Sequence, residues 1–124
     1  MQDAPDHTEI LAAVAALMRE TIMPLLSGHP SYQLRVAANA LDLVGRQIAL
    51  QPKFDAIERQ RLQALLRRDG SLEDLNHALC EAIERHTITL ETPGVAEHLW
   101  ATTMAKLAVD QPSYARYARE LTDR

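Results

Sequence analysis

Apolar residues recur along this chain at steps of three and four, the spacing that gathers side chains on one face of a helix. Prolines and glycines interrupt the pattern and divide the 124 residues into segments. The first apolar stripe runs from Ile10 to Leu25, and further helices are predicted over about residues 31–50, 53–68, 72–86, 93–110 and 113–122. The pattern therefore predicts an all-α fold: a mostly antiparallel bundle of five main helices plus a short C-terminal helix, in a single helical domain over residues 1–124.

Capping residues and prolines mark the expected ends of the first helix. Asp6 and Glu9 are three positions apart, just before the first apolar stripe, as in a capping box. In such a box each side chain accepts a hydrogen bond from the other residue's backbone N–H. Pro24 is expected to kink the last turn or to end the helix, because proline lacks the N–H that a helix interior needs.

Three further segments set the remaining boundaries. Pro52 suits the first position of a new helix, so a break is expected just before it. Asp69-Gly70 is expected to end that helix as a C-cap pair. The segment Thr87–Leu90 alternates as a strand does, but no other part of the chain offers a partner strand. We expect it to be an extended link, unless a second copy of the chain pairs with it.

Two rows of polar residues interrupt the apolar pattern. The first consists of Arg35, Asn39, Asp42 and Arg46, and the second of His98, Thr102, Lys106 and Asp110. Spacings of three to five residues place each row along roughly one side of a helix. A buried charge without a partner costs several kcal/mol, so the rows are expected to meet each other or a ligand. This requires residues 31–50 and 93–110 to lie side by side.

Six of these residues are candidates for a ligand site or a network: Arg35, Asn39, His98, Thr102, Lys106 and Asp110. In a site between the second and fifth helices, Arg35 and Lys106 would hold an anionic group such as a phosphate or carboxylate. In a purely structural network, the Asn39 amide would instead fix the register of closely packed helices.

A third interpretation leaves both rows in solvent. Asp42–Arg46 and Lys106–Asp110 would then be exposed i,i+4 pairs, which contribute only a few tenths of a kcal/mol each. Asp110 has a further alternative, as a cap for the start of the last helix.

Metal and nucleophile chemistry find little support. His77, Cys80 and Glu81 share one side of the fourth predicted helix, and zinc accepts all three residue types. No second cluster offers a clear fourth ligand, so the favoured interpretation is a surface His and Glu beside a small buried Cys. Cys80 has no sequence sign of activation, and no Gly-rich phosphate loop occurs.

We therefore predict no catalytic residue, no cofactor and no metal. One further set of residues could form a cofactor box but is predicted to be core instead, because its helical spacing suits packing: Trp100, Met104 and Leu107.

Composition narrows the possible partners. The formal net charge is −4, and no basic run is longer than Arg67-Arg68, so we expect no nucleic-acid binding. No apolar run approaches the length of a membrane span, and the N-terminal residues lack a signal pattern. The single cysteine cannot form an internal disulfide. Together these observations favour a cytoplasmic protein.

Four stretches of the chain resemble an uncharacterised bacterial all-helical family, a domain of unknown function. They are LAAVAALMRE, RVAANAL, LNHALCEAI and HLWATTMAKLAVDQPSY, and the most specific element is the closing segment Lys106–Tyr114. The resemblance implies no established activity and no defined catalytic residues. Members are often encoded near aminoglycoside-phosphotransferase-like kinases and acyl-CoA dehydrogenases, which suggests a part in acyl-CoA or hydroxy-acid catabolism.

The resulting functional hypothesis is a non-catalytic accessory or interaction protein. It would bind a partner protein such as a phosphotransferase-like kinase, or form a homodimer. The alternative is a small anionic-ligand binder or weak enzyme that uses the polar pocket between the second and fifth helices.

Overall fold

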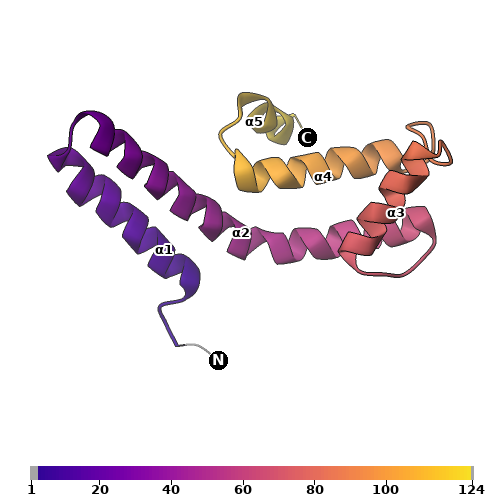
Figure 1. Cartoon of the computed structure of the whole chain (residues 1–124), viewed down its shortest axis with the longest axis horizontal. Helices are drawn as coiled ribbons and strands as arrows, with labels where there is room; N and C mark the ends of the chain where they lie inside the picture. The colour runs from indigo at the N-terminus through magenta and orange to yellow at the C-terminus, as the bar shows by residue number, and fades with distance from the viewer. Residues whose placement is uncertain (1–2, 124) are drawn as a thin grey trace. The chain divides into compact units, whose positions relative to one another are not determined.

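The computed structural model describes residues 3–123, and every regular element among them is helical. The elements are α1 (His7–Ala16), a π-helical segment η1 (Leu17–Ile22), a 3₁₀ turn η2 (Met23–Leu25), α2 (Gly28–Leu66), α3 (Leu72–Glu84), α4 (Val95–Asp110) and α5 (Ala115–Thr122), as Figure 1 shows. No β-strand occurs in this described part. The predicted all-α fold is confirmed, whereas the bundle arrangement stays a prediction.

The chain divides into two compact units, Met1–Gln51 and Pro52–Arg124. The first unit holds α1, η1, η2 and the first part of α2, and the second unit holds the rest. The predicted break before Pro52 is wrong, because α2 continues through this proline as one helix. Proline removes a single backbone hydrogen bond, and the helix-forming pattern on both sides keeps the neighbouring turns intact.

The first unit is a helical hairpin. In Figure 1, α1 and η1 run back alongside the first part of α2. The predicted capping box is present: Asp6 Oδ1 accepts from the Glu9 N–H at 2.9 Å, and Glu9 Oε2 accepts from the Asp6 N–H at 2.7 Å. The bond from the Glu9 N–H is the main reason why the pKa of Asp6 is lowered. Pro24 lies in η2, where the helix ends as expected, and Leu26 is extended.

Small residues set the close approach of the two helices in the hairpin. Ala15 and Ala38 are buried, and no other described residue of the first unit is buried to that degree. Between Ala15 and η2, the π-helical segment inserts a wider turn into the helix. A π-helical turn holds more residues than an α-helical turn, so it shifts the face that the next residues present.

The second unit has a small leucine core. Leu62 from α2 packs with Leu75 and Leu79 from α3, and three partly buried residues surround them: Leu66, Leu72 and Ile88. Ser71 caps α3 as its side chain accepts a bond from the Asp74 N–H at 3.1 Å. This cap starts α3 at the position that presents its apolar face to α2.

Two connections in the second unit differ from expectation. The helix before α3 ends at Leu66 with Arg67 in the left-handed conformation, rather than with Asp69-Gly70 as its cap. The segment Thr87–Leu90 is a compact turn rather than an extended link, because the Thr87 and Ile88 N–H groups both donate to the Ala82 carbonyl. These bonds give the Ala82 carbonyl at the end of α3 its hydrogen-bond partners, and the turn places Ile88 against the leucine core.

Substituting Leu75 with alanine tests this core. The side chain is fully buried, so the variant is expected to lose about 3 kcal/mol of unfolding free energy, through lost burial and the cavity that remains. Leu90→Ala is the matched control, because Leu90 is 71% exposed and its loss should cost less than about 0.5 kcal/mol. Urea unfolding measures both values. Equal losses in the two variants would mean that the leucine cluster is not the core.

Candidate functional site

The first polar row meets an arginine from its own hairpin. Arg19 of η1 donates from Nη2 to Asp42 Oδ2 at 2.6 Å and to Asn39 Oδ1 at 3.0 Å. A third bond joins Arg19 Nη1 to Asp42 Oδ1 at 3.3 Å. Asp42 therefore pairs with Arg19 in a two-pronged contact, which raises the pKa of the guanidinium.

Sequence reasoning overlooked Arg19, although a signal for it exists. It is the single basic residue in an alanine-rich apolar stretch, where a charge needs a partner across the helix contact. The other members of the row lie close by. Arg35 is exposed, and Arg46 lines a shallow groove of about 410 Å³ between α1 and α2, together with Asp42 and Leu11.

The second polar row also meets an arginine, and this one comes from the last part of α2. Arg61 donates from Nε to His98 Nδ1 at 3.4 Å and from Nη2 to Thr102 Oγ1 at 3.2 Å. His98 and Thr102 are one turn apart on α4, so a single guanidinium can reach both. The structure thus brings two of the candidate residues together around a residue that the sequence analysis did not select.

Arg61 could have been found from its position in the apolar stripe. Phe54, Ile57, Arg61 and Leu65 follow one another at helical spacing, so the arginine replaces an apolar residue on an inward-facing stripe. Because residues 53–68 contain many charged side chains, the sequence predicts that this helix is the most exposed one. An inward-facing charge such as Arg61 is therefore hard to distinguish there from the surface charges.

His98 is held in the neutral state. Only 2% of its surface is exposed, and burial is the main reason why its pKa falls below the ordinary value of 6.5. The Arg61 charge lowers the pKa further, while Glu58 raises it. Because Nδ1 accepts the bond from Arg61, the proton of the neutral ring lies on Nε2. His98 therefore contributes a buried neutral acceptor to the contact between α4 and α2.

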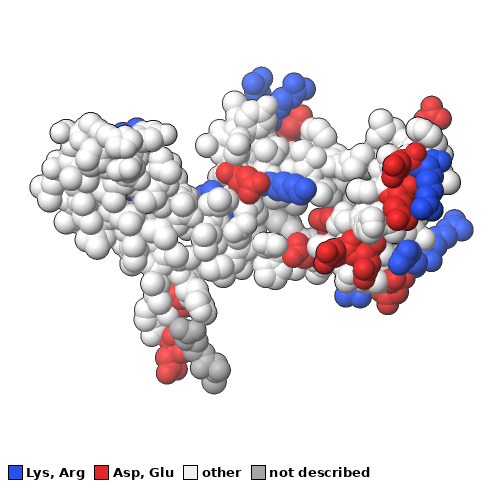
Figure 2. Space-filling view, viewed as in Figure 1, with Lys and Arg blue, Asp and Glu red and all other residues white. Residues whose placement is uncertain are grey.

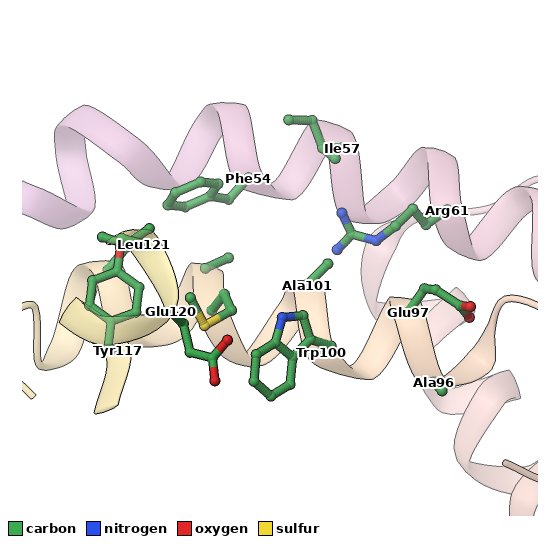
Figure 3. Close-up of a pocket in the computed structure, with 13 residues that line it drawn as sticks. Phe54, Ile57, Arg61, Ala96, Glu97, Trp100, Ala101, Tyr117, Glu120 and Leu121 are labelled. Atoms are coloured by element: carbon green, nitrogen blue, oxygen red, sulfur yellow. The ribbon is translucent and has the colours of Figure 1, made fainter. Parts of the chain in front are cut away.

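An apolar groove of about 840 Å³ opens beside Arg61. It runs between the last part of α2, α4 and α5, and Figure 3 shows its lining. The side chains that form its apolar surface are Phe54, Ile57, Trp100, Met104 and Leu121. The prediction that Trp100 is core is wrong, since 41% of this residue is exposed and its ring lines the groove. A second opening of about 500 Å³ shares Arg61 and Glu97 with the first.

The remaining candidates are surface residues. Lys106 and Asp110 on α4 are both exposed, and no ion pair joins them within residues 3–123. Asp110 does not cap the last helix, because Tyr114 occupies the N-cap position of α5 and no side chain caps it. Each polar row has hydrogen-bond partners inside its own unit. That the two rows meet each other stays a prediction.

The residues considered for zinc lie on α3 as a partial row. His77 Nε2 and Glu81 Oε1 are 3.8 Å apart, and Glu81 is also 3.6 Å from Arg85. Cys80 is exposed rather than buried as expected. Within the described residues no group of three or more metal-ligating side chains comes together.

In the same part of the chain, no helix has the length and apolarity that a membrane span needs.

Replacing His98 with glutamine tests its buried neutral state. Because the pKa is lower in the folded protein than in the unfolded chain, the unfolded chain binds more protons below about pH 6.5. The parent therefore loses stability as the pH falls, and the variant lacks this loss. We expect the stability difference between parent and His98→Gln to narrow between about pH 7.5 and pH 5.

Urea unfolding at each pH measures this difference, and His77→Gln on the exposed side of α3 is the control for loss of an imidazole. If the difference in unfolding free energy between the parent and His98→Gln stays constant or increases as the pH falls, the buried neutral state is contradicted.

The comparisons with known proteins agree with the resemblance seen in the sequence. The profile of a domain of unknown function, DUF6285, matches residues 24–114, which include all of α2, α3 and α4. None of the curated proteins and none of the solved structures compared with the chain matches it. The groove beside Arg61 lies partly inside the matched region, with its α5 residues beyond it. The chain therefore belongs to the DUF6285 family of domains of unknown function.

Proposed function

We propose that the protein is a non-catalytic interaction protein that self-associates through one edge of its hairpin. The observation that carries this proposal is the exposure of large apolar side chains on the first unit. Nine of them are exposed: Ile10, Val14, Leu17, Leu25, Leu26, Tyr32, Val36, Val44 and Ile48. The buried residues there are alanines, so the hairpin covers little apolar surface by itself. Exposed apolar side chains in this number are typical of an interaction site.

The apolar side chains gather on the edge of the hairpin that lies opposite the ion pair. Residues two apart in a helix point to nearly opposite sides, so Leu17 lies across the helix from Arg19, and Val44 lies across it from Asp42. Arg19 and Asp42 meet on one edge. Leu17 and Val44 therefore lie on the other edge. We call this surface the apolar edge, and it consists of Ile10, Val14, Leu17, Val44 and Ile48.

Few charges interrupt this surface. Residues 10–51 contain five charged side chains, namely Arg19, Glu20, Arg35, Asp42 and Arg46. On the face that Figure 2 shows, the helices of the hairpin are almost entirely uncharged, whereas acidic and basic residues gather over α3. Interface cores are depleted of charge in the same way.

The occupant that we propose is a second copy of the chain. Two copies related by a twofold axis would each place the same apolar edge against the other, so that four helices enclose a common apolar core. A specific interface buries about 800 Å² of accessible surface on each partner. Five half-exposed aliphatic side chains, together with their neighbours, can supply an area of this size. The Arg19–Asp42 pair remains on the outer edges, so like charges do not oppose each other across the contact.

The family resemblance supports a cellular role for this assembly. The resemblance implies that members are often encoded near phosphotransferase-like kinases and acyl-CoA dehydrogenases. On this basis we propose a cytoplasmic accessory role beside such a kinase in acyl-CoA or hydroxy-acid catabolism. The buried, neutral His98 and the apolar character of the groove lining fit a binding role better than a catalytic one.

Introducing lysine on the apolar edge tests the self-association. The parent is expected to sediment at twice the 13.9 kDa mass of one chain at micromolar concentration. Val44→Lys places a charge inside the contact and is expected to weaken the dimer at least about tenfold, since desolvating an unpaired ammonium costs more than about 1.4 kcal/mol. Sedimentation equilibrium measures the dissociation constant.

Arg35→Glu is the matched control. Arg35 shares a face of α2 with Asn39 and Asp42, so this variant changes a charge on the edge opposite to the contact and should leave the dimer intact. Circular dichroism confirms that each variant is helical. A parent that stays monomeric up to about 100 µM would contradict the proposal, as would equal effects of the two variants.

Co-purification tests the accessory role. A tagged chain expressed in its native host is expected to recover a phosphotransferase-like kinase, identified by mass spectrometry, at a fixed ratio to the chain. The same bait carrying Leu75→Ala, which weakens the core, controls for nonspecific capture by unfolded chains. Recovery of the chain without any kinase, under gentle conditions, would contradict this role. The self-association would be unaffected by that result, because sedimentation equilibrium tests it separately.

A further inference from the structure

We infer that the groove beside Arg61 binds an amphipathic anion, with a carboxylate head on the Arg61 guanidinium and an aliphatic tail along α4. This site lies wholly within the second unit, so it goes beyond the self-association proposed for the first unit. Three features support this site: an arginine without an ion-pair partner among the described residues, an apolar groove that begins at it, and an acidic residue at the far end that sets the direction in which a ligand lies.

No acidic side chain within residues 3–123 forms an ion pair with Arg61. In this part of the chain its guanidinium bonds two neutral acceptors, His98 Nδ1 and Thr102 Oγ1. These bonds use two of its five N–H donors. The residue is partly buried, where an arginine normally has a carboxylate partner. The two protein bonds hold the guanidinium in place, and its other donors are available to a carboxylate, which an arginine binds in a bidentate geometry.

The carboxylates on neighbouring positions do not supply this partner. Glu58, one turn before Arg61 on α2, accepts a hydrogen bond from Asn76 Nδ2 at 2.9 Å. Glu97 lines the same groove, but no ion pair joins it to Arg61 in the described part of the chain. Figure 3 shows the Glu97 carboxylate extending away from Arg61, while the guanidinium turns into the space between α2 and α4.

The groove that begins at Arg61 suits an aliphatic tail. Its volume of about 840 Å³ lies in the range of small-molecule sites, and its lining is largely apolar. Phe54 and Trp100 offer aromatic faces, and Met104 offers a flexible thioether that adapts to a chain. Three alanines of α4 (Ala101, Ala105 and Ala108) also line the groove, and their short side chains leave room for a ligand.

An acidic residue at the far end sets the orientation. Glu120 of α5 lines the groove together with Tyr117 and Leu121, away from Arg61 in Figure 3. A carboxylate head would be repelled at that end and attracted at the Arg61 end. The tail therefore points toward α5.

The single tryptophan of the chain gives a direct readout, because Trp100 lies in the groove and is 41% exposed. We expect decanoate, titrated into the full chain at neutral pH below its micelle concentration, to change Trp100 fluorescence saturably. Decanol, which has the same tail and no charge, should bind at least tenfold more weakly. Failure of decanoate to bind more tightly than decanol overturns the proposal, whatever the variants do.

Arg61→Gln locates the head. This variant should weaken decanoate at least tenfold and leave decanol unchanged. Arg59→Gln is the matched control: it removes the same charge from the exposed side of α2, where Arg59 pairs with Asp69 at 3.2 Å, and should leave decanoate binding unchanged. Equal loss in both variants would mean that net charge, rather than this site, attracts the anion.

Ala105→Phe fills the groove and should abolish binding of both probes while circular dichroism remains that of the parent. Because the apolar edge of the hairpin is unaltered in all three variants, their mass by sedimentation distinguishes failure of this site from failure of self-association.

Discussion

The guanidinium of Arg61 is the polar contact that links two helices of the second unit and the groove between them. It joins α2 to α4 through His98 and Thr102, and with the burial of His98 it keeps that imidazole uncharged. The leucine cluster lies between α2 and α3, and the two bonds from Arg61 add a polar contact between α2 and α4. The same side chain ends the apolar groove. The contact between α2 and α4 and the head of the proposed ligand thus involve the same residue.

The first unit is stabilised in a different way. Its helices approach through Ala15 and Ala38, and its main polar contact is the Arg19–Asp42 pair, in which both side chains are about one third exposed or more. Partly exposed ion pairs contribute little to stability. A short helical hairpin with no large buried side chain gains little from burial by itself. This is the physical reason for assigning its apolar edge to an interface.

Local signals in the sequence predicted the helices well. The Asp6–Glu9 capping box and the end of the first helix near Pro24 depend on chemistry within a few residues, and both are present. Pro52 was misinterpreted because a proline weakens a helix without always ending it. The turn at Thr87–Leu90 depends on the Ala82 carbonyl, which a period-two pattern does not reveal.

The candidate site was predicted in part. The polar rows do contain residues that bond across helix contacts, but both arginines that bind them lie outside the rows. A row on one helix indicates that a partner is needed without identifying it. Arg19 and Arg61 could have been recognised as isolated charges on apolar stripes, since burial makes such a charge seek acceptors. Trp100 was assigned to the core because helical spacing does not distinguish a packed face from the wall of an open groove.

The π-helical segment Leu17–Ile22 has a consequence for variation in chain length. Its wide turn is equivalent to one extra residue inserted into an α-helix. Deleting a single residue there would restore regular α-helical winding and leave the turns on its two sides in the same relative orientation. Ile10 and Val14 would then stay on the edge that they share with Leu17. The same deletion within α1 would instead rotate the preceding turns by about 100° and move their side chains off that edge. One-residue gaps between Ala16 and Met23 are therefore the changes in length that this hairpin tolerates best.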